Sequence, residues 1–470
     1  MVVGEVTIET DIVVIGGGPG GYVAAIRAAE LGLGTVLIER NERPGGVCLH
    51  RGCIPSKALL AAADLAHRAR NGGAMGIHAA EVSVDMAALH AWQCGIVDRL
   101  ARGVSALLER HGVTVVRGEA VLAGRNRVAV AASHGAERYV ARRGIVVATG
   151  AAALPLGSLR VDGARVLAAA EALFLKDLPS SVAVIGADYV AVELAVALRK
   201  LGSAVALLGA GQPFLPEVDP SISTLAERGL KRLGIAWHPQ AQPLELTEAG
   251  LRAGATGDTQ EMPAELVIVS SAGRAPNVAE LGLDLVGVRQ DEAGLILVDE
   301  RQRSSVDGIY AVGDVTPGPA WAHRAYRQGK VAAEVIAGRP AAYDPRAVPS
   351  VVLAEPELAS AGLGQEQARQ LGHDAVLSRF PWAASGRALT LGLSEGQTVV
   401  ISERGSGVVL GVHIAGLGAG ELIGEAALAL EMGAALEDIA ATIHAHPTRA
   451  EGIMEAAELA LGLPTHIAGK

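Results

Sequence analysis

The sequence predicts an α/β protein with two Rossmann-like domains followed by a C-terminal α+β domain. Residues 11–40 and 182–208 each run from an apolar strand through a glycine turn and an alanine-rich helix into a second apolar strand. From about Pro340 the pattern changes to short strands and amphipathic helices. At 470 residues, the chain is long enough for about three domains.

The first unit carries the spacing of a dinucleotide-binding loop. Gly16, Gly18 and Gly21 stand between its first strand and its helix. Such glycines allow a tight turn and let a pyrophosphate approach the backbone at a helix N-terminus, whose dipole favours negative charge. Glu39 ends the following strand, where an acid accepts hydrogen bonds from a ribose. We therefore expect the first unit to be a dinucleotide-binding domain.

The second unit repeats this arrangement but departs from it at two positions. Its loop reads G-x-D-x-x-A from Gly186, with Asp188 in place of the second glycine. Gly209 stands where the ribose-binding acid is expected. The neutral stretch 209–212 also lacks the basic residues that would meet a 2′-phosphate, which argues against a preference for NADP.

The regions outside the two units give weaker signals. A Pro- and Gly-containing stretch, 151–163, is the expected crossing between domains. A turn is expected at Gly405–Gly407. Residues 350–364 and 398–416 are expected to form strands, and residues 421–434 and 449–461 amphipathic helices.

The composition excludes several classes of protein. The formal net charge of −10 argues against a nucleic-acid or polybasic membrane surface. The N-terminus shows no basic segment followed by an apolar run, and no stretch approaches 18 uninterrupted apolar residues. Three cysteines cannot form a secreted disulfide framework. We expect a cytoplasmic protein without membrane or nucleic-acid partners, in which a close cysteine pair is catalytic or metal-binding.

Cys48 and Cys53, in PGGVCLHRGCIPSK, form such a pair. A zinc site would need about four ligands, and the only other cysteine, Cys94, stands apart. Two buried thiols remain an alternative. The favoured interpretation is a redox disulfide at the start of a helix, where the helix dipole and Lys57 favour a thiolate. No metal site is expected.

The cysteine motif, taken with the glycine loop, resembles the flavin-dependent pyridine nucleotide–disulfide oxidoreductases. Within them, Cys-Ile-Pro-Ser-Lys is most similar to the dihydrolipoamide dehydrogenase branch. The similarity covers nearly the whole chain, because further motifs match along it. These are ATG at 148–150, GRAPN at 273–277, GIYAVGD at 308–314, PELASAG at 356–362 and HAHPTRAE at 444–451.

This resemblance implies FAD and NAD as cofactors. The first glycine loop and Glu39 would hold the ADP half of FAD, and Asp314 its ribityl or phosphate portion. Tyr189 would lie over the nicotinamide pocket. The full implied cofactor-binding set is Gly16, Gly18, Gly21, Glu39, Lys57, Gly150, Gly186, Tyr189, Gly273 and Asp314.

The resemblance also implies the roles of the reacting residues. Cys53 would face the flavin as the charge-transfer thiolate, and Cys48 would be the interchange thiol that exchanges with the substrate. Lys57 and Glu193 would pair beside the flavin.

His446 suits the task of a base, because dithiol exchange requires proton transfer near sulfur. Glu451 would fix its tautomer and orientation. In the family this pair reaches the disulfide of the other subunit, which implies a homodimer. His444 is expected to be structural.

Asp188 raises a separate expectation about NAD binding. It suits a helix N-cap, but it adds like charge where a pyrophosphate binds, which costs about 1–3 kcal/mol. The missing ribose hydrogen bond adds about 1 kcal/mol. We expect NAD(H) binding to be weakened while FAD binding and dithiol chemistry are intact. Reversion by Asp188→Gly together with Gly209→Glu is expected to improve NADH use.

The predicted protein is an FAD-dependent enzyme that oxidises a lipoyl-type dithiol, possibly held on a carrier protein. Electrons would pass through the Cys48–Cys53 disulfide and FAD to NAD+ or another acceptor. One alternative is a glutathione reductase-like or mercuric reductase-like enzyme. Another is a non-catalytic redox-sensing or structural flavoprotein that has lost NAD binding. The expected domains are 1–150 (FAD-binding, first part), 151–272 (NAD(P)-binding-like), 273–345 (FAD-binding, second part) and 346–470 (C-terminal dimerisation domain).

Overall fold

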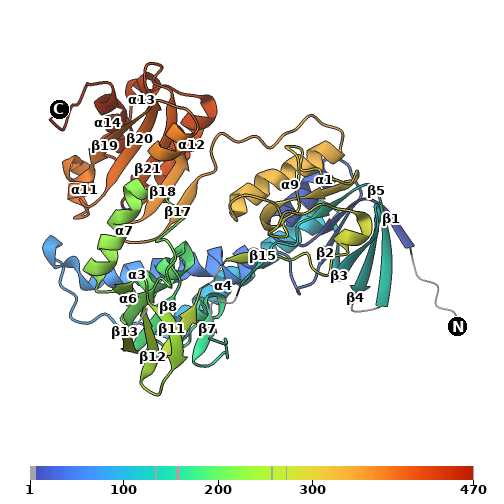
Figure 1. The fold of residues 1–470 in the computed structure, drawn as a ribbon, viewed down its shortest axis with the longest axis horizontal. Helices are drawn as coiled ribbons and strands as arrows, with labels where there is room; N and C mark the ends of the chain where they lie inside the picture. Colours follow the sequence, from blue (N-terminus) through green and yellow to red (C-terminus); the bar gives the residue numbers. More distant parts are fainter. Residues whose placement is uncertain (1–6, 133–134, 155–158, 256–257, 271–272, 469–470) are drawn as a thin grey trace. The chain divides into compact units, whose positions relative to one another are not determined.

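The computed structural model describes residues 7–132, 135–154, 159–255, 258–270 and 273–468 (Figure 1). They form two compact units. The described residues of 1–58, 90–155 and 271–344 make up unit 1, and those of 59–89, 156–270 and 345–470 make up unit 2. The division falls within two helices, α3 (Cys53–Arg70) and α4 (Met86–Arg110).

Unit 1 is built on a six-stranded mixed sheet. Its strands are β1 (Thr7–Ile15), β2 (Thr35–Glu39), β3 (Thr114–Gly124), β4 (Arg127–Ala132), β5 (Gly135–Val147) and β16 (Ile309–Ala311). β1 pairs in parallel with β2 and β5, and β5 with β16, whereas β3, β4 and β5 pair antiparallel. The run Ile12–Ile15 is buried, as expected for a central parallel strand.

Helices α1 (Pro19–Glu30) and α9 (Ala322–Ile336) of unit 1 lie side by side (Figure 1). Glycines allow this close approach. A Cβ on Gly329 would lie 2.4 Å from the Gly20 carbonyl oxygen. The predicted strand–loop–helix–strand unit at residues 11–40 is therefore confirmed, and a second helix covers its loop helix.

Unit 2 contains the second predicted strand–helix–strand segment. Its parallel sheet has the order β10-β9-β8-β14-β7. The strands are β7 (Val166–Ala168), β8 (Ser181–Ile185), β9 (Ala204–Leu208), β10 (Ala236–His238) and β14 (Leu266–Val269), with helices α5 (Ala169–Ala172), α6 (Tyr189–Leu201) and α7 (Pro220–Leu233). An antiparallel sheet of β11 (Gln242–Leu246), β12 (Gly250–Ala255) and β13 (Asp258–Pro263) adjoins it in sequence.

The C-terminal part of unit 2 is an antiparallel sheet of order β17-β18-β21-β20-β19 with helices packed on it. Its strands are β17 (Ser350–Val352), β18 (Leu358–Gly362), β19 (Ala375–Pro381), β20 (Gln397–Glu403) and β21 (Val409–Ala415). Its helices are α10 (Gln365–Gln370), α11 (Gly386–Thr390), α12 (Ala419–Met432), α13 (Leu436–Ala441), α14 (Glu451–Ala460) and the short η3 (Trp382–Ala384). The predicted α+β character, including the turn between β20 and β21, is confirmed.

Short elements complete the chain. In unit 1 these are α2 (Gly46–Arg51), α8 (Leu283–Val286), η2 (Gly313–Val315) and the antiparallel pair β6 (Ala151–Ala153) with β15 (Arg274–Pro276); in unit 2 there is η1 (Gly72–Met75). Of the predicted crossing 151–163, residues 155–158 lie outside the described residues. None of the described helices is long and apolar enough to span a membrane.

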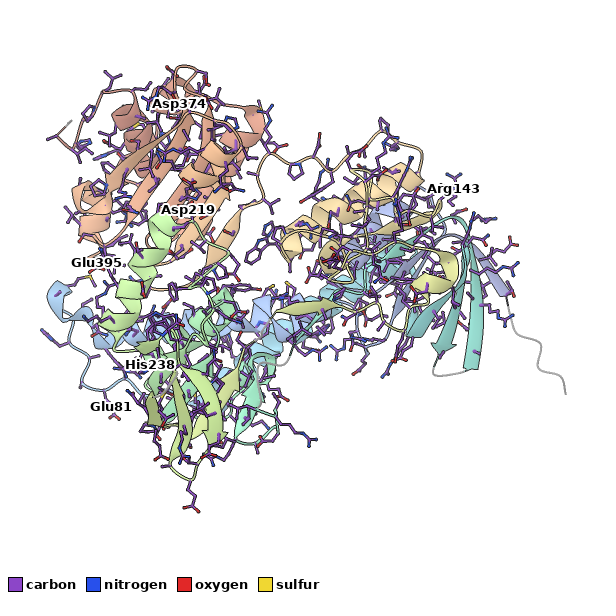
Figure 2. All side chains as sticks on the ribbon, in the orientation of Figure 1. Glu81, Arg143, Asp219, His238, Asp374 and Glu395 are labelled. Atoms are coloured by element: carbon purple, nitrogen blue, oxygen red, sulfur yellow. The ribbon has the colours of Figure 1, made fainter. Side chains whose placement is uncertain are left out.

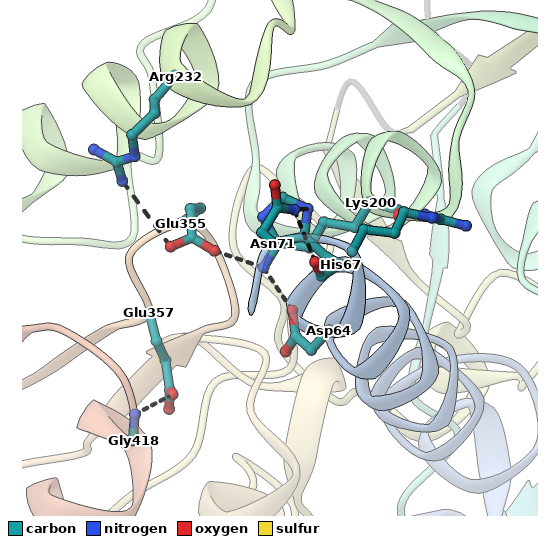
Figure 3. Close-up of polar contacts among 9 residues, drawn as sticks. Asp64, His67, Asn71, Lys200, Arg232, Glu355, Glu357 and Gly418 are labelled. Atoms are coloured by element: carbon teal, nitrogen blue, oxygen red, sulfur yellow. Dashed lines mark hydrogen bonds and ion pairs between the residues drawn. The ribbon is translucent and has the colours of Figure 1, made fainter. Parts of the chain in front are cut away.

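Residues 59–89 pack in unit 2, although they follow the cysteine motif directly in sequence. Leu59, Leu60, Ala63 and Met86 are buried in the same core as the side chains of α6. An ion cluster around the buried Lys200 adds to this contact (Figure 3). Lys200 is only 5% exposed, and its Nζ lies 2.5 Å from Asp64 Oδ1 and 2.6 Å from Glu355 Oε2. The pKa of Lys200 is raised, because attraction by these carboxylates outweighs the effect of burial.

Candidate active site

The two motif cysteines lie at a helix junction in unit 1. Cys48 is in α2 and is half-buried, Gly52 follows α2, and Cys53 is the exposed first residue of α3. No disulfide joins the two sulfurs in this structure. Cys94 lies on α4 with its sulfur 3.7 Å from His90 Nε2, apart from the motif.

The cysteine motif is docked onto the first glycine loop. The Gly45 N–H donates to the Gly17 carbonyl oxygen at 2.7 Å. Gly45 and Gly46 have φ values of 131° and 63°, which favour glycine. A Cβ on Gly46 would lie 2.6 Å from the Gly18 Cα, so the two loops meet with no room for a side chain. This contact places the dithiol beside the loop predicted to bind phosphate.

The two sulfurs are electrostatically unequal. A hydrogen bond with the Cys53 side chain raises the pKa of Cys48, and burial and the negative charge of Cys53 act in the same direction. The positive charge of Lys57 partly opposes them. The Cys48 thiol therefore holds its proton more tightly than an ordinary cysteine. The carbonyl oxygen of Pro55 accepts a 2.7 Å bond from the buried Gln93 amide, which fixes the first turn of α3.

A tyrosine pair lies near the dithiol and was not predicted from the sequence. The hydroxyl oxygens of Tyr22 on α1 and Tyr326 on α9 are 3.1 Å apart, and the rings are edge-to-face with centroids 6.0 Å apart. Burial raises the pKa of both phenols. The two residues are far apart in sequence, so only the α1–α9 packing shows their proximity.

The first glycine loop fits the ADP half of FAD. Gly16 has φ 99°, and a Cβ on it would lie 2.4 Å from the Ala148 carbonyl oxygen. The N-cap of α1 is Gly18, which has no capping side chain, so the first N–H groups of this 12-residue helix are available to a phosphate. A Cβ on Gly21 would lie 1.7 Å from the Gly16 carbonyl oxygen, which explains the third glycine.

Glu39 lies beside this loop at the end of β2. Its side chain is buried, with Oε2 accepting from the Gly17 N–H at 2.7 Å and Oε1 from the Asn41 N–H at 2.7 Å. The carboxylate is therefore held at the loop, in the place where the sequence predicts a ribose contact.

The remaining residues predicted to bind the flavin are Asp314, Gly150 and Gly273. Burial raises the pKa of Asp314 despite Arg274, whose Nη1 lies 3.4 Å from its Oδ2. Gly150 and Gly273 flank the β6–β15 pair, where the Leu154 N–H donates to the Gly273 carbonyl oxygen at 2.9 Å. Next to Gly150, the buried Thr149 hydroxyl has no hydrogen-bond partner among the described residues, as expected for a group that meets a ligand.

The loop of the second unit is arranged differently. Gly186 has φ 138°, as the tight turn requires, but Asp188 is the N-cap of α6. Its Oδ1 accepts from the Ala191 N–H at 2.9 Å and from the Ser270 hydroxyl at 2.7 Å. Tyr189 begins α6. Glu193, buried one turn later, accepts from the Leu353 N–H at 3.0 Å.

The proposed reversion at Gly209 is wrong on steric grounds. A Cβ there would lie 2.6 Å from both the Pro239 carbonyl oxygen and the ring atom Cη2 of Trp237. A glutamate side chain therefore cannot replace Gly209 unless β10 moves. No local sequence pattern indicates this contact, because it depends on the pairing of β9 with β10.

The C-terminal histidines of unit 2 form carboxylate pairs. His446 Nδ1 lies 2.7 Å from Glu451 Oε1, and the other oxygen of Glu451 accepts from the Thr448 N–H at 2.7 Å. Burial alone would raise the pKa of Glu451, but the bonds from His446 and Thr448 lower it. The His446 side chain is 75% exposed, which leaves its other nitrogen accessible.

Two further pairs lie in the same part of unit 2. The His444 side chain is buried and bonds Glu425 at 2.7 Å, in keeping with a structural role. His466, which was not predicted to take part, pairs with the buried Glu455 one turn along α14 from Glu451.

The predicted residues fall into two groups. Cys48, Cys53, Lys57 and the predicted flavin contacts lie in unit 1, whereas Glu193, Tyr189, His446 and Glu451 lie in unit 2. The Lys57–Glu193 pair joins residues of different units and stays a prediction.

Comparison with known families identifies the family of the chain. A family model described as pyridine nucleotide-disulphide oxidoreductase matches residues 10–329, and the dimerisation domain of the same family matches residues 348–457. The chain therefore belongs to the pyridine nucleotide-disulphide oxidoreductase family. The second match supports a homodimer.

Individual relatives narrow the class. The chain is 42% identical over 474 residues to dihydrolipoyl dehydrogenase of Geobacillus stearothermophilus, covering 100% of both chains, and 40% identical over 475 residues to that of Halobacterium salinarum, covering 99% of both. A crystal structure titled LpdA from Mycobacterium tuberculosis has a TM-score of 0.87 at 27% identity and covers 96% of this chain and 99% of that one. The chain is thus a flavin-dependent disulphide oxidoreductase of the dihydrolipoamide dehydrogenase type, an enzyme type that uses FAD and NAD.

Proposed function

We propose that this protein oxidises a lipoyl-type dithiol through a Cys48–Cys53 disulfide and FAD, with NAD+ as the terminal acceptor. The observation that carries the proposal is the docking of the Cys48–Cys53 motif on the first glycine loop, where Gly45 bonds Gly17 and Gly46 contacts Gly18. The names of the full-length relatives support the lipoyl substrate.

The dithiol step balances as two exchanges. In the oxidised enzyme, one substrate thiolate attacks the Cys48 sulfur, the Cys48–Cys53 bond breaks, and the electron pair leaves with Cys53. The second substrate sulfur then attacks the mixed disulfide, which releases the cyclic substrate disulfide and Cys48. Two electrons have then passed to the cysteine pair.

Each of the chain's own groups has a part in this step. The N-terminus of α3, whose first residue is Cys53, would stabilise the Cys53 thiolate, and Lys57 brings a positive charge to the neighbouring Cys48. His446 takes the proton of the incoming thiol, and Glu451 holds the imidazole in position. The high exposure of His446 suits a residue that serves the cysteine pair of a second subunit, and the dimerisation-domain match agrees with that arrangement.

FAD supplies a two-electron acceptor for the reduced cysteine pair. The groups proposed to hold it are the first glycine loop, Glu39, Gly150 and Asp314, and its reacting ring would lie near Cys53 and Lys57.

Cysteine variants test the proposal. Dihydrolipoamide and an excess of NAD+, which serves as the electron acceptor, are mixed anaerobically with the holoenzyme and with Cys48→Ser, Cys53→Ser and Cys94→Ser, and lipoamide formation is measured. We expect turnover in the wild type and in Cys94→Ser, and a loss of at least about 1,000-fold in the two motif variants. Turnover that survives Cys48→Ser would contradict the assignment. A wild type inert to dihydrolipoamide would favour a non-catalytic flavoprotein.

A further inference from the structure

The two Rossmann units of this chain differ in the charge of the residue at the start of their loop helices, where a dinucleotide would bind. In unit 1 the N-cap of α1 is Gly18, without a capping side chain, and a Cβ there would meet nothing closer than the Gly46 Cα at 3.8 Å. In unit 2 the corresponding N-cap of α6 is Asp188, whose carboxylate bonds the Ala191 N–H. The helix start that binds a pyrophosphate in such folds thus already carries an anion.

The Asp188 carboxylate is also fixed in place. Ser270, directly after β14, donates its hydroxyl to the same Oδ1 atom at 2.7 Å. A carboxylate held by a backbone N–H and a hydroxyl resists rotation away from the loop. A diphosphate arriving here loses one helix N–H and meets like charge at close range.

The ribose end of the second unit is closed by an aromatic ring. In unit 1 the strand β2 ends in the buried carboxylate of Glu39, whereas in unit 2 Gly209 follows β9 and faces Trp237. Trp237 lies on the edge strand β10, next to His238, which Figure 2 labels. Its ring is 5.3 Å from the ring of Phe214, and its Nε1 donates to Glu227 Oε1 at 3.0 Å. A ring held on two sides leaves no place for an acid that would bind a ribose diol.

We infer that Asp188 is an affinity-determining residue that weakens the binding of the diphosphate of NAD(H) and NADP(H) to the second Rossmann unit. The inference rests on the proposed function, because that function places a pyridine nucleotide in this unit. The inference adds that weak binding of NAD+ limits the half-reaction in which electrons pass to the nucleotide. Removal of the charge is expected to tighten NAD+ binding by about 10- to 100-fold.

Direct binding tests the inference without relying on turnover. The Kd of NAD+ is measured by calorimetry on the oxidised holoenzyme for the wild type, Asp188→Asn and Asp188→Gly. Asparagine keeps a helix-capping oxygen and removes only the charge, so it separates repulsion from loss of the cap. Asp219→Asn is the matched control, because Asp219 caps α7 of the same unit by accepting from the Ser221 N–H at 2.8 Å (Figure 2).

The expected result is tighter NAD+ binding by Asp188→Asn and by Asp188→Gly, with no change in Asp219→Asn. The advantage of Asp188→Asn should shrink between about 0.05 and 0.5 M salt, because screening acts only on charge repulsion. A wild-type Kd within about twofold of that of Asp188→Asn overturns the inference. Flavin reduction by dihydrolipoamide is followed in the same samples, so failure of the dithiol reaction is seen separately from failure of this inference.

Discussion

Replacing Glu451 with glutamine tests whether the His446–Glu451 pair drives dithiol oxidation. Both oxygens of Glu451 accept hydrogen bonds, from His446 Nδ1 and from the Thr448 N–H, each at 2.7 Å. Glutamine has one accepting oxygen, so the variant loses one of these bonds and the negative charge. A charge-assisted hydrogen bond contributes about 1.5–3 kcal/mol, so we expect lipoamide formation to slow by about 10- to 150-fold.

The assay is anaerobic stopped-flow reduction of the flavin by dihydrolipoamide, with kcat and KM determined separately in steady state. The loss should fall mainly on the rate, because Glu451 acts through His446 and does not bind substrate. Glu425→Gln is the matched control, since it removes the carboxylate from the His444 pair on α12. Equal rates in Glu451→Gln and the wild type, or equal losses in both variants, would refute the reasoning.

Three further predictions concern the ion cluster at Lys200, the glycine contact at Gly46 and the pH dependence of the Glu451 contribution to stability. Lys200→Met leaves two facing carboxylates, one of them 45% exposed, without their cation, and should lower the free energy of unfolding of the holoenzyme by about 2–4 kcal/mol (Figure 3). Denaturant unfolding measures this, and Lys231→Met, at an exposed position, should not change the midpoint. Equal midpoints for the two variants would contradict a stabilising role of the ion cluster. Gly46→Ala should lower the FAD-to-protein ratio measured by absorbance, because Gly46 has a positive φ and its Cβ would collide with the first glycine loop. Gly95→Ala is the control and should retain full flavin, because the space around Gly95 is open. The pKa of the Glu451 carboxyl is lowered on folding, so the stability that its ionised form contributes is present above about pH 4.3 and is lost as the pH falls through the pKa of the folded state. The melting temperatures of Glu451→Gln and the wild type should therefore converge in acid. A difference in melting temperature that stays constant with pH would be inconsistent with this.

The local signals in the sequence predicted the two strand–helix–strand units well. The periodicity of apolar residues, the spacing of glycines and the apolar runs are local properties of the sequence, and they determine such units. The predicted elements correspond to β1, α1 and β2 in the first unit and to β8, α6 and β9 in the second. The contact of His446 with Glu451 was also predictable, because five residues and a helix start separate the two.

Contacts between distant segments were not predictable. The helical pattern after Cys53 does not show which core it joins, and residues 59–89 pack in unit 2 through Leu59, Leu60 and Ala63. The contact of Trp237 with Gly209 depends on the pairing of β9 with β10, which no local pattern reports. That contact is what excludes an acid at Gly209.

The most direct test of the proposed dithiol chemistry is the flavin spectrum of the holoenzyme after anaerobic addition of one equivalent of dihydrolipoamide. The proposal predicts a long-wavelength charge-transfer absorption between the flavin and the Cys53 thiolate, present in the wild type and absent from Cys53→Ser. An unchanged wild-type spectrum, or the same absorption in Cys53→Ser, would contradict it.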